Sequence, residues 1–175
     1  MICLGIESTA HTFGVGIIEN EKILSDVKKQ YRPEKGGIVP SQAMEFLKKV
    51  KENVLEESLE KAKLKIKDID VIAFSKGPGM PLSLRVGMNF SKELALKYKK
   101  PLIGVNHLIS HLEIGKLLTK AKDPVFILAT GANTQIIFFE GNKYHIGGEC
   151  LSIGLGNALD KFGREIELEF PAGPK

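Results

Sequence analysis

A three-strand pattern occurs twice in this chain of 175 residues, and the repetition limits the possible fold more than any other feature of the sequence. Each copy consists of short apolar runs separated by polar turns, which is typical of strands joined as hairpins. The repetition predicts a duplicated architecture, with a first lobe at 1–122 and a second, incomplete lobe at 123–175. The runs lie at 2–6, 13–18, 22–28, 125–130, 135–140 and 143–149.

Strands and helices alternate between the two copies. Short apolar runs at 70–75 and 101–105 predict buried strands, and each is followed by a stretch with helical periodicity. This alternation indicates an α/β protein with parallel pairing in its sheet. The expected helices lie at 42–62, 83–98, 107–119 and 157–165.

A loop is predicted at 31–40, where prolines and glycines accumulate. Ser41 follows it, and its hydroxyl is expected to cap the next helix by accepting a hydrogen bond from a free backbone N–H group. The second lobe ends after a single helix. We therefore expect its sheet to have an unpaired edge.

Composition favours a globular protein outside membranes. Hydrophobic residues make up 43% of the chain and charged residues 26%, but no run of about 18 apolar residues predicts a membrane span. The N-terminus lacks the features of a signal peptide, so we expect a cytoplasmic protein with reduced thiols at Cys3 and Cys150. The net charge of +4 permits contact with nucleic acid without requiring it.

His107 and His111 are the first candidates for chemistry. A spacing of four places both imidazoles on one face of a helix, one turn apart. Two histidines in this arrangement can bind one metal ion when other segments supply the remaining ligands. The same spacing also occurs by chance on helix surfaces, and that reading is open from the spacing alone.

Two turns and one helix offer further candidates. Glu7–Gly14 and Ala129–Gln135 have the small and hydroxylated residues that let a backbone approach a phosphate closely, although ordinary hairpin turns look alike. Asp160 lies three residues after Asn157 and one helical turn before Arg164. From spacing alone, Asp160 could simply pair with Arg164 on the surface.

Six motifs then occur in a fixed order. The motifs are Ser75-x-Gly-Pro-Gly, Leu84-Arg-Val-Gly87, Gly104-Val-Asn-His-x-x-x-His111, Gly131-x-Asn-Thr-Gln135, Gly156-Asn-Ala-Leu-Asp160-Lys-Phe and Pro171-x-Gly-Pro-Lys175. In these motifs the chain strongly resembles, over essentially all of its length, the universal tRNA N6-adenosine threonylcarbamoyltransferase family in its archaeal form.

The resemblance implies both a fold and an activity. The implied fold is the duplicated actin-like ATPase (ASKHA) fold, here with a complete first lobe and a truncated second lobe. The implied activity is transfer of threonylcarbamoyl from threonylcarbamoyl-adenylate to N6 of adenosine 37 in tRNAs that read ANN codons. The implied partners are tRNA and KEOPS-type subunits, among them a small kinase and a dimerisation subunit. No membrane association is expected.

The resemblance also implies site residues. His107 and His111 match a pair that binds one divalent metal ion, iron or zinc, which acts as a Lewis acid on the activated carbonyl. The other positions match contacts to the adenylate, an ATP-derived substrate. They are Leu128, Ala129, Thr130, Gly131, Ala132, Asp160 and Gly173.

The chain departs from the family pattern in three ways. Leu128 stands where the archaeal pattern has a tyrosine, and Ala132 stands where it has a glycine. Family members are also roughly twice as long, and the other half normally carries the aspartate that is the third protein ligand. The sequence therefore predicts an N-terminal half that needs a second chain. The alternatives are a catalytically inactive nucleotide-binding scaffold and a different actin-like ATPase or small-molecule kinase.

Overall fold

The computed structural model describes residues 1–33, 37–169 and 171–173. Residues 34–36 of the expected loop lie outside this part of the chain, as do the last two residues of the final motif. The chain forms two compact units, 1–111 and 112–175. Each unit is described separately.

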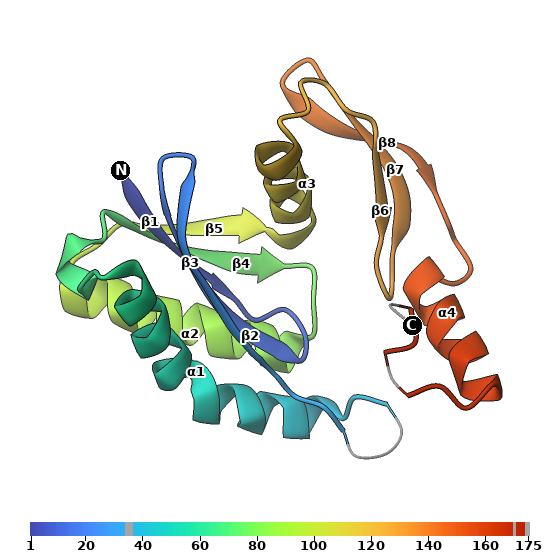
Figure 1. Cartoon of the computed structure of the whole chain (residues 1–175), viewed down its shortest axis with the longest axis horizontal. Coiled ribbons are helices and arrows are strands. Elements are labelled where there is room, and N and C mark those ends of the chain that lie inside the picture. Colours follow the sequence, from blue (N-terminus) through green and yellow to red (C-terminus); the bar gives the residue numbers. More distant parts are fainter. Residues whose placement is uncertain (34–36, 170, 174–175) are drawn as a thin grey trace. The chain divides into compact units, whose positions relative to one another are not determined.

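The first unit is built on a five-stranded sheet with the order β3-β2-β1-β4-β5. β1 pairs antiparallel with β2 and parallel with β4, and β4 pairs parallel with β5 (Figure 1). The expected parallel pairing is therefore present beside an antiparallel meander. The strands are β1 (Ile2–Glu7), β2 (Thr12–Glu19), β3 (Lys22–Gln30), β4 (Val71–Gly77) and β5 (Leu102–Asn106).

Helices α1 (Pro40–Ala62) and α2 (Pro81–Tyr98) cover one face of this sheet (Figure 1). Alternate residues of β1 and β2 point toward the helices, and Leu4 and Ile17 meet there across the strand pair. Helical periodicity brings Leu47 of α1 into the same core. Each of these elements buries apolar side chains on one face, which explains why the apolar periodicity of the sequence predicted the strands and helices.

The start of α1 differs from expectation. Val39 occupies the cap position without a side-chain hydrogen bond, and Pro40 is the first helical residue. The prediction that Ser41 caps the helix is therefore wrong. Proline suits the first helical position because its ring fixes φ near the helical value and its missing N–H group would have no partner there.

The second unit contains a three-stranded antiparallel sheet with the order β6-β7-β8. Within the described residues, β6 has a strand partner only on its β7 side, whereas β1 is flanked by β2 and β4. The predicted succession of three strands and one helix is confirmed. The elements are β6 (Phe126–Ala129), β7 (Thr134–Glu140), β8 (Lys143–Glu149) and α4 (Leu155–Glu165).

Helix α3 (His107–Thr119) contains the boundary between the two units, since the first ends at His111 and the second begins at Leu112. A short 3-10 turn, η1 (Ile66–Asp68), precedes β4. In the described parts of the chain, no helix combines the length and apolar character that a membrane span requires.

Truncation of Leu47 tests the core of the first unit. Leu47 is fully buried (0% exposed), so Leu47→Ala is expected to lower the free energy of unfolding by about 2–5 kcal/mol through lost burial and a residual cavity. Urea denaturation followed by circular dichroism measures the change. Leu96→Ala in α2 is the control: that side chain is 70% exposed, and the expected change is below about 0.5 kcal/mol. Equal effects would contradict the assigned core.

Candidate functional site

The histidine helix follows β5 without an intervening loop. Asn106, the last residue of β5, caps the helix through its side-chain oxygen, which accepts hydrogen bonds from the backbone N–H groups of Leu108 (2.9 Å) and Ile109 (3.2 Å). This cap fixes the direction of the first turn and therefore of His107. Asn106 was visible in the sequence only as a motif residue, and its capping role was not predicted.

The two histidine side chains converge. Nε2 of His107 lies 3.3 Å from Nε2 of His111, with the ring planes 74° apart. Two nitrogen ligands about 2.0–2.1 Å from one tetrahedral ion lie about 3.3 Å from each other. The donor pair therefore fits a single transition-metal ion. Within the described residues, no group of three or more His, Cys, Asp or Glu side chains is placed to hold a metal ion, so the histidine pair has no third ligand of these types there.

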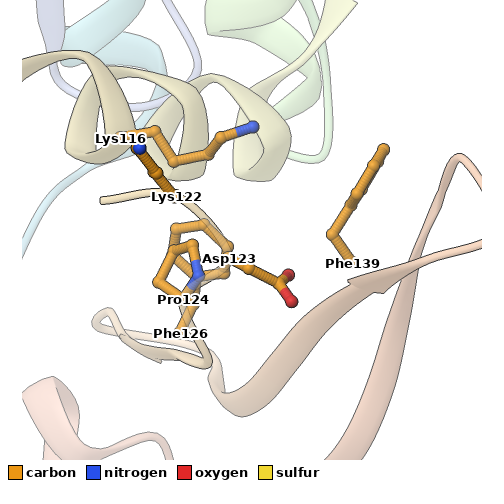
Figure 2. A pocket seen from close by; sticks show the side chains of 6 residues that line it. All are labelled: Lys116, Lys122, Asp123, Pro124, Phe126 and Phe139. Carbon is orange, nitrogen blue, oxygen red and sulfur yellow. The ribbon is translucent and has the colours of Figure 1, made fainter. Parts of the chain in front are cut away.

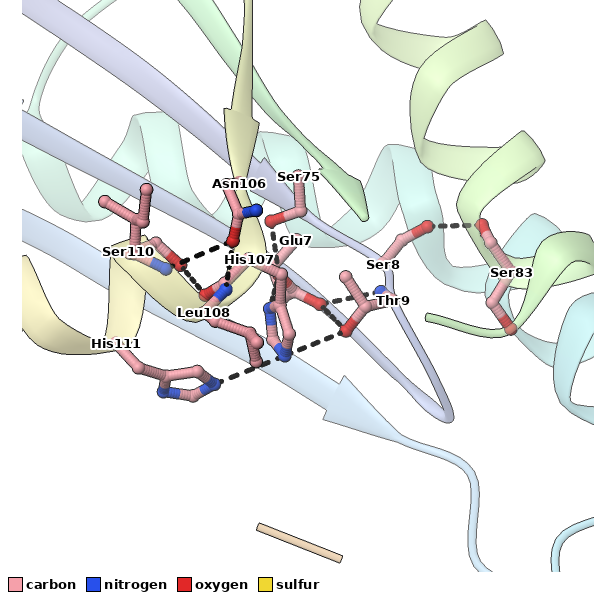
Figure 3. Close-up of polar contacts among 11 residues, drawn as sticks. Glu7, Ser8, Thr9, Ser75, Ser83, Asn106, His107, Leu108, Ser110 and His111 are labelled. Atoms are coloured by element: carbon pink, nitrogen blue, oxygen red, sulfur yellow. Dashed lines mark hydrogen bonds and ion pairs between the residues drawn. The ribbon is translucent and has the colours of Figure 1, made fainter. Parts of the chain in front are cut away.

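Glu7 lies behind His107, at the end of β1. Its Oε2 is 3.1 Å from Nδ1 of His107 and also accepts a hydrogen bond from the Ser75 hydroxyl (Figure 3). Its Oε1 accepts hydrogen bonds from the backbone N–H (2.6 Å) and the hydroxyl of Thr9. The sequence marked Glu7 only as part of a turn, because nothing in the sequence pattern indicated contact with a residue 100 positions away.

The electrostatics favour the charge states that a metal site needs. Burial alone would raise the pKa of Glu7, but hydrogen bonds from His107, Ser75 and Thr9 outweigh it and lower that pKa to about 2. Burial lowers the pKa of His111, and a positive charge on His107 lowers it further, while Glu7 acts in the opposite direction. A carboxylate and a neutral imidazole are therefore favoured near neutral pH.

The connection between β4 and α2, together with α2 itself, holds the turn after β1. The backbone N–H of Met80 donates to the carbonyl of Thr9 (2.7 Å), and the N–H of Gly87 donates to the Ser8 hydroxyl (3.0 Å). A Cβ at Gly79 would lie 2.5 Å from the Thr9 carbonyl, and one at Gly87 would lie 2.6 Å from the Ser8 oxygen. Glycine is needed at both positions because the two segments approach so closely.

In the second unit, the loop after β6 lies against the start of α4. The N–H groups of Gly156 and Asn157 donate to the carbonyls of Thr130 (3.0 Å) and Gly131 (3.2 Å). Within the described residues, the N–H groups of Gly131 and Ala132 form no hydrogen bond. Backbone N–H groups in the first turn of α4 therefore donate to the loop, whereas two N–H groups of the loop have no partner within the described residues.

The side chains flanking this loop divide between interior and surface. Leu128 is buried, whereas Ala129 is exposed. Leu128 therefore fills the interior of the unit and offers no polar atom at the position where the family pattern has tyrosine.

Asp160 contacts the final segment of the described chain. Its Oδ1 accepts a hydrogen bond from the backbone N–H of Ala172 at 2.7 Å. Among the described residues it forms no ion pair with Arg164, so the surface-pair reading is wrong. The contact holds Gly173 beside α4, where its nearest neighbour is Leu159. Asp160 and Gly173 thus lie close together.

A separate cavity of about 310 Å³ in the second unit contains none of the site residues expected from the sequence. The Lys116 ammonium group lies 5.4 Å above the Phe139 ring, which also packs edge-on against Tyr144. These contacts join α3 to the sheet. The cavity is lined by Lys116, Lys122, Asp123, Pro124, Phe126 and Phe139 (Figure 2).

Comparison with known proteins identifies relatives over the whole chain. A family model described as tRNA N6-adenosine threonylcarbamoyltransferase matches residues 21–175. A protein of that name from Thermococcus sibiricus is 51% identical over 175 residues, which are 100% of this chain and 54% of the relative. A probable bifunctional tRNA threonylcarbamoyladenosine biosynthesis protein from Thermoplasma acidophilum is 46% identical, over 100% of this chain and 33% of its own length. The chain thus spans about half the length of the first relative.

Solved structures resemble the fold. YeaZ from Pseudomonas aeruginosa matches with a TM-score of 0.56 and 14% identity, over 85% of this chain and 65% of that one. Component A of (R)-2-hydroxyglutaryl-CoA dehydratase from Acidaminococcus fermentans matches with a TM-score of 0.56 and 17% identity, over 97% and 55%. Both have the actin-like ATPase fold, so the expected α/β fold class is confirmed.

A pair of glycine substitutions tests the contact that holds the last described segment. A Cβ at Gly163 would lie 2.2 Å from Cβ of Ala172, so Gly163→Ala is expected to destabilise the chain by about 1–3 kcal/mol through overpacking. Gly115→Ala in α3 has no atom within 4 Å of the added methyl and is expected to stabilise by about 0.5–1 kcal/mol. Thermal unfolding measures both. Stabilisation by both substitutions would contradict the close contact.

Proposed function

We propose that this chain, which belongs to the tRNA N6-adenosine threonylcarbamoyltransferase family, acts as an N-terminal half of such a transferase. The reaction would move threonylcarbamoyl from its adenylate to N6 of adenosine 37 in ANN-decoding tRNAs. A bond forms between N6 and the carbamoyl carbon, the bond from that carbon to the phosphate oxygen breaks, and AMP and a proton leave. The observation that carries the proposal is the convergence of His107 and His111 at 3.3 Å.

His107 and His111 would hold one divalent ion, iron or zinc, through their Nε2 atoms. When bound, such an ion supplies Lewis-acid polarisation of the carbonyl group under attack. The chain's own contribution is a pair of convergent nitrogen donors, one of which is fixed by a helix cap and a carboxylate. The identity of the metal is part of the proposal.

The second unit would bind the adenylate. The free N–H groups of Gly131 and Ala132 are suited to an anionic or carbonyl oxygen, and Leu128, Ala129 and Thr130 lead into that loop. Asp160 uses Oδ1 on Ala172, and within the described residues Oδ2 forms no hydrogen bond. That oxygen is suited to a ribose hydroxyl. The list of adenylate contacts is completed by the backbone of Gly173.

Exposed apolar residues in the second sheet support the need for a further segment. Ile127 and Ile136 pair across β6 and β7 and are 76% and 48% exposed. In the first unit, Leu4 and Ile17 pair in the same way across β1 and β2 and are 0% and 1% exposed beneath two helices. We assign this face, with the free edge of β6, to the C-terminal half that the relatives contain. It would add a strand parallel to β6 and helices over Ile127 and Ile136.

Partners beyond this half are carried over from the family resemblance. They are tRNA, a small kinase and a dimerisation subunit of the KEOPS type. The net charge of +4 is compatible with contact to tRNA phosphates.

A second candidate function is a catalytically inactive nucleotide-binding scaffold of the same complex. The observation that favours it is the buried hydrocarbon side chain of Leu128 in place of a tyrosine. One measurement distinguishes the two functions: the completed protein turns over substrate if the chain is a half-enzyme, and it does not if the chain is a scaffold.

Metal binding tests the histidine assignment. The purified chain is expected to bind about one Zn²⁺, measured by titration and elemental analysis, because both Nε2 atoms face one point. His107→Ala combined with His111→Ala is expected to abolish this binding. His145→Ala, in β8, is the control and is expected to leave it unchanged. Equal metal content in the double variant and the wild type would exclude the pair as ligands.

Reconstitution tests the requirement for a second half. The chain alone, given tRNA, ATP, threonine, bicarbonate and an adenylate-forming enzyme, is expected to give little modified tRNA. Addition of the C-terminal half of the Thermococcus sibiricus relative is expected to restore turnover. Full activity without another polypeptide would refute the half-enzyme proposal, and assembly without turnover would favour the scaffold.

The same mixture tests the apolar face. Ile127→Asp is expected to weaken co-purification with the C-terminal half at least tenfold, because it places a charge in the proposed contact. Leu96→Asp, at an equally exposed position in the first unit, is the matched control. Equal binding by both variants would exclude the face around Ile127 as the contact.

A further inference from the structure

We infer that Glu7 is a positioning residue, which fixes His107 in the tautomer whose Nε2 lone pair faces His111. The inference rests on the proposed metal site and deepens it. It assigns to Glu7 a function that differs from metal ligation and from contact with a phosphate.

Glu7 is held from both sides. Ser75 donates to Oε2, and the backbone and hydroxyl of Thr9 donate to Oε1, so the carboxylate cannot rotate freely about its last bond. These donors come from β4 and from the turn after β1, and the carboxylate is aimed between them at α3 (Figure 3). The direction of Glu7 is therefore set before His107 contributes.

The contact is on the side of the ring that does not bind the ion. Glu7 Oε2 approaches Nδ1 at 3.1 Å, while Nε2 of the same ring faces His111. A carboxylate behind a histidine ligand is the arrangement that orients imidazoles in many zinc sites. Glu7 and the two histidines thus do not form a three-ligand group, in agreement with the described residues as a whole.

Two hydrogen-bonding arrangements compete for the His107 proton. With the proton on Nδ1, the ring donates to an ionised carboxylate, which can only accept. With the proton on Nε2, it would donate to Nε2 of His111 at 3.3 Å or to the Thr9 hydroxyl at 3.4 Å and leave a lone pair against Glu7. A charge-assisted hydrogen bond is roughly twice as strong as a neutral one, and here it is also the shorter. The Nδ1–H tautomer is therefore selected.

The consequence is a prepared ligand. A neutral imidazole with its proton on Nε2 must move that proton before it can bind a cation, whereas the Nδ1–H form presents its lone pair directly. Within the described residues, His111 contacts no carboxylate, and its nearest polar partner is His107. Glu7 thus orders His107, one of the two proposed ligands.

Two measurements test the inference. Long-range ¹H–¹⁵N NMR of the metal-free chain at pH 8 is expected to show the Nδ1–H form of His107 in the wild type. In Glu7→Ala it is expected to show a mixture or the Nε2–H form. Zn²⁺ titration is expected to show affinity about 10- to 100-fold weaker in Glu7→Ala. Glu7→Gln keeps an oxygen acceptor and is expected to restore the tautomer and part of the affinity.

Controls separate the possible failures. Glu19→Ala, an exposed glutamate in β2, is expected to change neither readout. Zn²⁺ binding that does not depend on the histidines would refute the proposed metal site, while the NMR result would still test Glu7. Histidine-dependent binding with an unchanged tautomer and affinity in Glu7→Ala would overturn the inference alone. If Glu7→Ala does not fold, Glu7→Gln and Ser75→Ala carry the test through affinity. Each is expected to weaken Zn²⁺ binding, and unchanged affinity in both would overturn the inference.

Discussion

The parallel pairing of β1, β4 and β5 is the constraint on which the first unit depends. Because parallel strands end at the same edge of a sheet, their carboxyl ends bring distant segments together. Glu7 ends β1, Ser75 lies near the end of β4, and Asn106 ends β5 immediately before His107. Burial of the opposite side chains beneath α1 and α2 fixes the strand order and therefore this edge. Core packing therefore brings together Glu7, Ser75, Asn106 and His107, although none of these four residues belongs to the core.

The sequence predicted what depends on local spacing. The histidine pair was found because both residues lie on one helix, and the element order was found because apolar periodicity is local. Glu7 was not assigned to the pair, since a contact across 100 residues depends on strand order rather than on spacing. Ser41 was wrongly predicted to cap α1 because hydroxyl side chains are common at that position. The helix begins one residue earlier, at Pro40. From the sequence, Asp160 could pair with Arg164 or contact the adenylate. In the structure its Oδ1 accepts a hydrogen bond from the backbone N–H of Ala172.

The second unit repeats the strand pairing of the first unit but only part of its burial of apolar side chains. Its antiparallel strands pair as β1 to β3 do, yet Ile127 and Ile136 remain exposed where their counterparts are buried. The loop after β6 nevertheless packs closely against α4, since Gly154 and Gly156 leave no room for a side chain. This contact is formed although Ile127 and Ile136 remain exposed.

Within the described residues β6 is paired on one side only, and this edge has a consequence for self-association. An unpaired strand presents a row of backbone donors and acceptors that any extended peptide can extend, including the same strand of another copy. Natural edge strands are protected by short length, charges, prolines or bulges. β6 has only the first of these protections, since it consists of the four apolar residues Phe126, Ile127, Leu128 and Ala129, so its short length is what limits self-association through this edge.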